Sequence, residues 1–202
     1  WRIFEIHELQ SVVQSARATK INTHVRAGVS MLYAHWEGFV KNASNAYVSY
    51  LAHRSELNRD LLPCFVALGM KSKIAETQES NKSAVFVSAI SFLLAEMDKP
   101  VRLPKAGAIK AESNLSSDVF VNIAGWIGVD TSRYSTRFNL IDQTLLGSRN
   151  KIAHGEFLEI DPERFQVLTS DVLEMLRWFK TDIENAVVTE AFLKRTSAPM
   201  TV

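Results

Sequence analysis

The sequence predicts a globular, all-α protein, and three observations support this prediction. First, the 202 residues include only 8 Gly and 5 Pro, and such sparse turn-forming residues favour long helices over many short strands. Second, apolar residues recur at spacings of three and four in most segments, as on the buried face of a helix. Third, hydrophobic residues make up 47% and charged residues 22%, which is the composition of an ordinary globular protein. We expect one domain of six or seven helices over residues 1–196, followed by a frayed tail at 197–202.

The N-terminal half is expected to contain two helices. The first covers residues 2–20, and Asn22 and Thr23 are expected to end it and to cap a long helix over residues 25–54. The apolar stripe of that long helix repeats every three or four residues, as a buried face does. It comprises Val29, Leu32, Trp36, Val40, Ala43, Tyr47 and Tyr50.

The middle of the chain is expected to hold two more helices and one irregular segment. A third helix is expected over residues 57–76, with Pro63 near its start or at a kink. Residues 83–97 are strongly apolar and predict a buried helix, although Val-Phe-Val in its first half also suits a strand. Residues 99–115 contain Pro100, Pro104 and Gly107 and predict a loop, which is functional or mobile or folds as a short hairpin.

The C-terminal part shows clear helix boundaries. Ser116 or Ser117 is expected to cap a short helix that runs to Ile127 and stops at Gly128. A further helix is expected over residues 136–153, with Gly155 just past its end. Asp161-Pro162-Glu163 then begins the last helix, to about Leu193, because an acidic cap, Pro at the first position and an acid near the positive dipole end suit a helix start.

Charge and cysteine content narrow the classes of function. The net charge of +1 gives no overall attraction to nucleic acid or membrane, so RNA contact requires a local patch. The stretch from Lys99 to Lys110 also carries Arg102 and Lys105 without an acid; it is either such a patch or a solvated loop. The single Cys64 is compatible with a reducing cytoplasm. We expect no membrane span, no metal site and no cofactor.

The pattern with most chemical content is Arg149-Asn150-Lys151-Ile152-Ala153-His154, at the end of a predicted helix. RNA cleavage by the ribose 2′-hydroxyl needs proton transfer near pH 7 and positive charge on the developing phosphorane. Histidine is suited to the first task and the forked guanidinium of arginine to the second. Asn150 can orient the histidine or donate to a phosphate oxygen. The alternative is that the motif has no catalytic role. Its spacing arises often by chance, and cations near a helix C-terminus also interact favourably with the helix dipole.

On a regular helix, Asn150 and His154 share one face with Gln143 and Gly147, and the long Arg149 side chain can lean over it. One histidine does not easily act as acid and base in the same step. A twofold dimer brings two copies of the motif across one cleft. We therefore expect a homodimer with a composite active site and this face at the interface.

Three segments together resemble the HEPN superfamily, and within it the RiboL-PSP-HEPN branch. They are Leu32-Tyr33-Ala34-His35-Trp36-Glu37-Gly38-Phe39-Val40, then Ser113-Asn114-Leu115-Ser116-Ser117, and Leu145-Leu146-Gly147-Ser148-Arg149-Asn150-Lys151-Ile152-Ala153-His154-Gly155-Glu156. The resemblance covers residues 21–193. It implies a metal-independent endoribonuclease, often a dimer and commonly the toxin of a toxin–antitoxin or antiphage system, restrained by an antitoxin partner.

The same resemblance implies roles for individual residues. Arg149 and His154 are the implied catalytic pair, with Asn150 beside them. Glu37 is the implied further acidic residue near the pair; its alternative is a surface pair with Lys41. The remaining candidates for RNA contact or for support of the site are Lys151, His35, Tyr33, Lys105 and Arg102.

A competing hypothesis comes from another functional class. The same pocket would bind a nucleotide or a partner protein without cleaving RNA, and the chain would act as a dimeric regulatory module. The near-neutral net charge slightly favours this alternative, whereas the presence of Arg149, Asn150 and His154 together argues against it.

Overall fold

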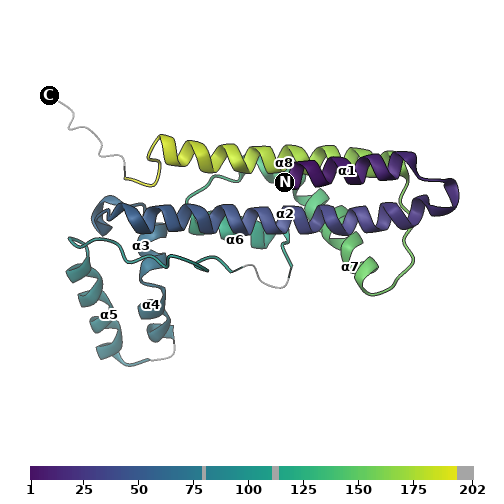
Figure 1. Cartoon of the computed structure of the whole chain (residues 1–202). Helices are drawn as coiled ribbons and strands as arrows, with labels where there is room; N and C mark the ends of the chain where they lie inside the picture. Colours follow the sequence, from purple (N-terminus) through teal and green to yellow (C-terminus); the bar gives the residue numbers. More distant parts are fainter. Residues whose placement is uncertain (79–80, 111–113, 195–202) are drawn as a thin grey trace. The chain divides into compact units, whose positions relative to one another are not determined.

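The computed structural model describes residues 1–78, 81–110 and 114–194 of the chain, and the tail expected at 197–202 lies outside them. Helices dominate the described residues, which contain no strand, so the predicted all-α class is confirmed (Figure 1). None of the described helices is long and apolar enough to cross a membrane. The α-helices are α1 (Arg2–Ser15), α2 (Ala18–Arg54), α3 (Pro63–Gly69), α4 (Lys71–Gln78), α5 (Ser83–Glu96), α6 (Ser117–Trp126), α7 (Gly147–Ala153) and α8 (Pro162–Val188).

The chain forms two compact units. Unit 1 comprises residues 1–43, 111–123 and 130–181, and unit 2 comprises residues 44–110, 124–129 and 182–202. We expected a single domain over residues 1–196. The helices α2, α6 and α8 each contribute residues to both units.

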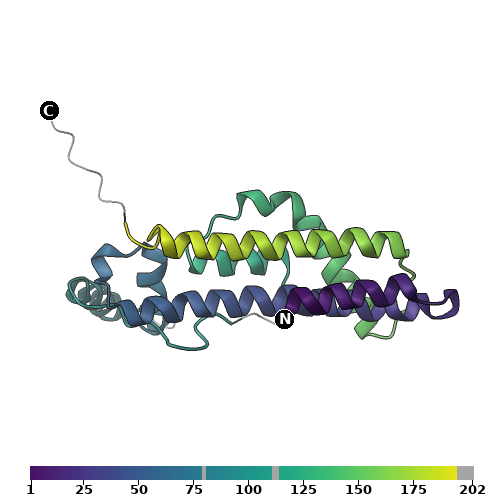
Figure 2. The same cartoon turned by 45° about the horizontal axis from the view of Figure 1, so that its top comes forward.

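Unit 1 has an aromatic core. The Phe120 ring centroid lies 5.3 Å from that of Trp36, 4.9 Å from Tyr134 and 5.7 Å from Phe179, and all four residues are fully or nearly fully buried. Aromatic pairs at these separations add to the free energy gained by burial. Because a Cβ at Gly28 would lie 2.6 Å from the Phe165 ring, the glycine allows α8 to approach α2 within this unit. Figure 2 shows α1 running alongside the first part of α2.

Unit 2 holds the irregular segment in place through side chains of its helices. The Asn45 side-chain amide donates to the Ile109 carbonyl oxygen at 2.9 Å and accepts from the Ile109 N–H at 3.0 Å. The Asn58 side chain donates to the carbonyl oxygens of Glu96 and Lys99. Residues 99–110 therefore follow an irregular path that these bonds hold, and they form no hairpin; of the rest of the predicted loop, residues 111–113 lie outside the described residues.

The predicted break between the first two helices differs from the observed one. The chain leaves α1 at Ala16, whose backbone is extended (φ −70°, ψ 139°), and Asn22 and Thr23 lie within α2. Asn and Thr cost only a few tenths of a kcal/mol inside a helix, roughly. Two such residues do not interrupt a long helix whose neighbouring Val25 is fully buried.

Two predictions for the middle of the chain also need correction. Residues 57–76 do not form one helix: a 3₁₀ turn at Asn58–Asp60 precedes α3, and α4 follows at Lys71. Pro63 begins α3, where its missing N–H has no helical partner to lose. Residues 83–96 do form a helix rather than a strand, but α5 has no buried residue.

The last two predicted helices differ from the structure at their ends. The stretch before the motif is a 3₁₀ helix at Ser132–Arg137 and a π-helix at Leu140–Leu146, and regular α-helix begins only at Gly147. The 100° step assumed for Gln143 and Gly147 therefore does not hold before α7. The helix α8 begins at Pro162 as expected, but it ends at Val188, and Glu190 has a left-handed backbone (φ 51°).

Candidate active site

The motif lies on α7, which ends in a well-defined cap. Gly155 has φ 76°, its N–H donates to Ile152, and the N–H of Glu156 donates to Lys151. This pair of bonds is the Schellman motif, which requires a residue that tolerates the left-handed conformation. His154 is the last residue before the reversal, and its N–H still donates to Asn150 at 2.9 Å. The cap thus fixes the backbone of His154 one turn beyond Asn150.

The Arg149 guanidinium is held on one of its edges. Its Nη1 donates to the side-chain oxygens of Asn114 and Asn150, each at 2.8 Å. A guanidinium has five N–H donors, and Arg149 makes no further hydrogen bond to the part of the chain that the structure describes. The edge formed by Nε and Nη2 therefore remains available, and it has the fork geometry that binds two oxygens of a phosphate.

The face of the same guanidinium lies over an aromatic ring. Arg149 Cζ is 4.7 Å from the centre of the Tyr33 ring. Arginine stacks well on aromatic faces because its planar group is weakly hydrated. Tyr33 is buried, at 2% exposure, so the platform beneath Arg149 is part of the core of unit 1.

The Tyr33 hydroxyl connects this platform to Glu37, one turn further along α2. It accepts the Leu115 N–H at 2.7 Å, and the Glu37 carboxylate accepts from it. Burial raises the pKa of Tyr33 above its usual value, the Leu115 N–H lowers it, and Glu37 raises it again. Tyr33 thus stays a neutral donor, and Glu37 reaches the Arg149 cluster through it. Glu37 thus contacts Tyr33 rather than Arg149 or His154.

The segment before α6 supplies further support for α7. Its Asn114 binds Arg149, and the Ser116 hydroxyl caps α6 by accepting the Val119 N–H. The Ser117 N–H and hydroxyl both donate to the Asp142 carboxylate, at 2.7 Å and 2.6 Å. Asp142 lies in the π-helix, and its carbonyl oxygen accepts the Gly147 N–H. The carbonyl of Asp142 would lie 3.3 Å from a Cβ at position 147.

The sequence reasoning missed two of these residues. Asn114 was part of a recognised segment but was not proposed as a partner of Arg149, and Asp142 was not singled out. No local spacing signals either contact, because Asn114 and Arg149 are 35 residues apart. The polar residues Asn114, Ser116 and Ser117 around the apolar Leu115 are the available signal, since polar side chains in a core-facing segment need partners.

His154 differs from Arg149 in its surroundings. Its side chain is exposed, and among the described residues it makes no hydrogen bond or ion pair. An exposed imidazole can exchange protons with a bound substrate. Asn150 joins the two by accepting from Arg149 through its side chain and from the His154 N–H through its backbone.

His35 lies in another cluster of unit 1. It is 2% exposed and contacts α1: Arg2 donates to its Nδ1 at 3.5 Å, and its Nε2 lies 3.2 Å from Glu5. Burial lowers the pKa of His35 despite the attraction of Glu5. Since Nδ1 accepts from Arg2, the neutral ring carries its proton on Nε2, toward Glu5. The structure does not bring His35 to Arg149.

The predicted basic residues occupy two places. The Lys151 side chain is exposed on α7. Arg102 lines a cavity of about 340 Å³ in unit 2 together with Lys71, Ser72 and Lys110, and Lys105 is exposed in the same irregular segment. No group of three His, Cys, Asp or Glu side chains with metal-site geometry occurs among residues 1–78, 81–110 and 114–194.

An all-α fold that presents Arg-Asn-x-x-x-His at a capped helix end, with the arginine fixed from an earlier helix, defines the HEPN class of helical domains. A family model described as HEPN_MAE_28990-like HEPN matches residues 1–192, and the chain belongs to this family. The match confirms the predicted HEPN superfamily. The name of the matching family differs from that of the RiboL-PSP-HEPN branch, which the motifs resemble. No curated protein and no solved structure matches the chain.

Proposed function

We propose that this HEPN protein is a metal-independent endoribonuclease, with Arg149 and His154 as its catalytic residues. The observation that carries the proposal is the state of Arg149. Its Nη1 is occupied by Asn114 and Asn150, its face is stacked on Tyr33, and its Nε and Nη2 edge is left for a ligand. Such a group is preorganised for an oxyanion, and preorganised charge is worth several kcal/mol in a transition state, roughly.

The reaction proposed is transesterification. The 2′-hydroxyl loses its proton to a base, its oxygen bonds to phosphorus, and the bond from phosphorus to the 5′-oxygen breaks. The leaving oxygen takes up a proton, so the products are a 2′,3′-cyclic phosphate and a 5′-hydroxyl end. Arg149 stabilises the negative charge of the phosphorane, and His154 carries out one of the two proton transfers.

The second proton transfer requires another group. In the proposal a second copy of the chain supplies its own His154 across a twofold axis, with the α7 face at the interface. The protein would act as the toxin of a toxin–antitoxin or antiphage system, with an antitoxin protein as its partner. Its location in the cytoplasm, with RNA as substrate, is part of the same proposal.

The test is cleavage of total RNA and of tRNA in excess EDTA, by the wild type and by His154→Ala. We expect the wild type alone to give fragments with cyclic-phosphate ends, and the variant to lose about 10²-fold or more of the rate. His7→Ala, at an exposed histidine on α1, is the matched control and should cleave normally. If neither the folded wild type nor His154→Ala cleaves RNA, the protein is instead a binding module. Equal cleavage by both would contradict the role of His154.

A further inference from the structure

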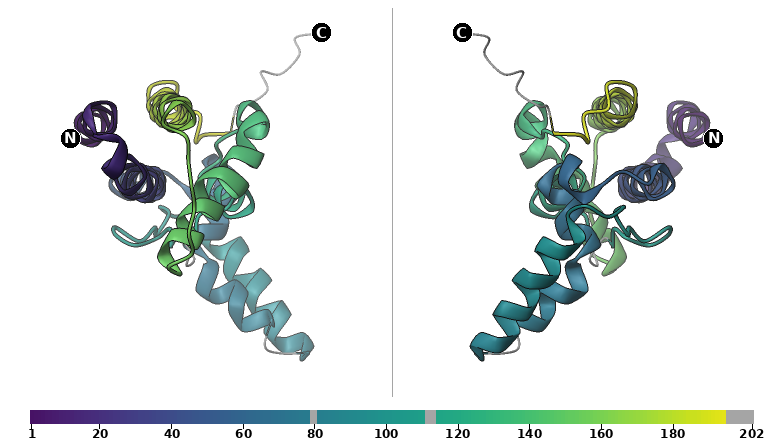
Figure 3. Two further views of the ribbon diagram at one scale, coloured as in Figure 1. Left: turned by 90° about the vertical axis from the view of Figure 1, so that its right-hand side faces the viewer. Right: turned by 90° about the vertical axis from the view of Figure 1, so that its left-hand side faces the viewer.

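Helix α5 in unit 2 is an apolar helix whose side chains are not buried by other elements. It has no buried residue, and its exposed side chains include Phe86 (47%), Val87 (63%), Ile90 (57%) and Leu94 (69%). These four lie on one side of the helix, because Phe86, Ile90 and Leu94 follow one another at intervals of four and Val87 is adjacent. A helix of this kind is normally found inside a protein core or an interface. Figure 3 shows α5 and α4 side by side as a hairpin.

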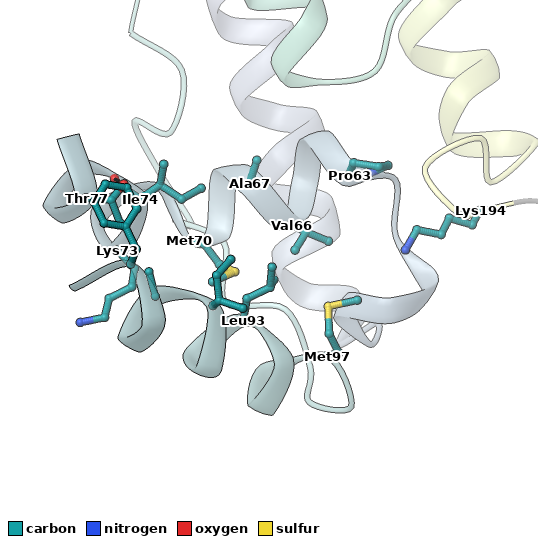
Figure 4. A pocket seen from close by; sticks show the side chains of 13 residues that line it. Pro63, Val66, Ala67, Met70, Lys73, Ile74, Thr77, Leu93, Met97 and Lys194 are labelled. Carbon is teal, nitrogen blue, oxygen red and sulfur yellow. Dashed lines mark hydrogen bonds between the residues drawn. The ribbon is translucent and has the colours of Figure 1, made fainter. Parts of the chain in front are cut away.

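The apolar surface continues into a groove. A cavity of about 500 Å³ opens between α5 and the helices α3 and α4, and its lining includes Val66, Met70, Ile74, Leu93 and Met97 (Figure 4). Phe86 and Ile90 line this groove as well as contributing to the exposed stripe. Methionine side chains adapt to the shape of whatever packs on them. The groove and the stripe therefore form one continuous surface.

The distribution of charge on α5 indicates which kind of partner can pack on it. From Ser83 to Ala95 the helix carries no charged side chain. Near a twofold axis each residue approaches its own copy, so a charge there would face a like charge, and an uncharged helix avoids this cost. The charged residues that flank the helix have opposite sign, Lys82 before it and Glu96 at its end, and Glu96 also pairs with Lys99 of its own chain at 2.7 Å. An antiparallel pair of α5 helices brings these opposite charges, and opposite ends of the helix dipoles, together.

We propose that α5 is a homodimer contact, in which it packs antiparallel against the α5 of a second copy, with Ile90 near the twofold axis. In this register Phe86 lies against the partner's Leu94, and the groove receives side chains from the partner's stripe. The four exposed side chains of the stripe present on the order of 400 Å² of apolar surface, since three of them are aliphatic and smaller than an aromatic side chain of about 200 Å². This is about half of the roughly 800 Å² that each partner buries in a stable interface, and the apolar walls of the groove add to it. The contact does not rest on the proposed ribonuclease activity.

The test is disulfide cross-linking in full-length protein that carries Cys64→Ala, which removes the only native cysteine. Ile90→Cys should form a covalent dimer on mild oxidation, because the two copies of this position meet at the axis. Ser88→Cys is the matched control: position 88 is exposed on the same helix but points away from the stripe, and it should stay uncross-linked.

A second measurement is the mass in solution by light scattering. Ile90→Asp places two like charges at the axis and should lower the assembly mass twofold, whereas Ser88→Asp should leave it unchanged. The proposal is overturned if Ile90→Cys does not cross-link, or if Ile90→Asp keeps the wild-type mass; a monomeric wild type would overturn it too and would point to a different protein partner for the groove. RNA cleavage is measured separately: failure of the α5 contact in a wild type that still self-associates leaves the proposed activity untouched, whereas a monomeric wild type would also contradict its composite site.

Discussion

The Arg149 guanidinium stacks on the Tyr33 ring, with Cζ 4.7 Å from the ring centre. The two residues are 116 positions apart in the sequence and belong to α7 and α2. Tyr33 in turn is fixed by Leu115 and Glu37. The orientation of the arginine in the motif is thus set by a buried aromatic residue on another helix.

Removing the Tyr33 hydroxyl should cost stability more than activity. In Tyr33→Phe the ring remains under Arg149, but the buried Leu115 N–H loses its acceptor, which costs about 1–3 kcal/mol. We expect a lower midpoint in thermal unfolding by circular dichroism, with RNA cleavage retained at a temperature where the variant is folded. Unchanged stability would show that the hydroxyl bond to Leu115 contributes nothing.

Removing the stacking surface should lower activity as well as stability. Tyr33→Leu removes both the hydroxyl bond and the platform, so cleavage should fall below that of Tyr33→Phe at equal folded fraction. The comparison of the two variants isolates the stacking contribution, which cation–π energies place at about 1–2 kcal/mol. Equal rates in the two variants would argue that the ring does not position Arg149.

Asn114 is predicted to be a positioning residue. Asn114→Ala removes one of the two acceptors of Arg149 Nη1, so the guanidinium gains freedom and the cleavage rate should fall about 10-fold, or about 1.4 kcal/mol in the barrier. The effect should fall on kcat rather than on KM, because substrate contacts remain. Asn122→Ala, at an exposed asparagine of α6, is the control and should cleave at the wild-type rate.

The charge of Arg149 alone should not be sufficient. Arg149→Lys keeps the positive charge but loses the two-pronged Nε and Nη2 edge and the planar stack on Tyr33. We expect a loss of about 10²-fold or more in cleavage, with circular dichroism unchanged. The same exchange at Arg164, which is exposed on α8, should have no effect. A fully active Arg149→Lys would contradict the proposed phosphate contact.

His35 should make the stability of the protein depend on pH. Burial lowers the pKa of His35 from its usual 6.5, so the unfolded chain binds a proton more readily than the folded protein. The free energy of unfolding therefore falls as the pH drops below about 6.5 and levels off below the folded pKa. Arg2 and Glu5 face the ring from α1, and both remain in the variant tested.

The measurement is urea unfolding at several pH values between 5 and 7.5. His35→Gln should reduce the loss of stability on acidification, whereas His7→Gln should keep the wild-type dependence. Parallel curves for wild type and His35→Gln would show that this histidine titrates alike in both states.

The termini of several elements were predictable because local chemistry decides them. Asp161-Pro162-Glu163 begins α8, and Gly155 ends the reversal after α7 because only a residue that tolerates positive φ fits there. The break after α1 was not predictable from capping residues, since Ala16 carries no such signal. The π-helix at Leu140–Leu146 was also missed, because its side-chain pattern resembles that of an α-helix and its distinguishing bonds are in the backbone.

The helix content, the superfamily and the order Arg149, Asn150, His154 followed from the sequence by itself, because periodicity, capping and short motifs are local properties of the chain. Tertiary structure decided which partners these residues have. Only the packing of α2, α6 and α7 within unit 1 brings Tyr33 and Asn114 to Arg149 and takes His35 to α1 instead. Likewise, the apolar sequence of α5 predicted burial, but whether neighbours cover a helix depends on contacts between distant segments, which periodicity does not encode.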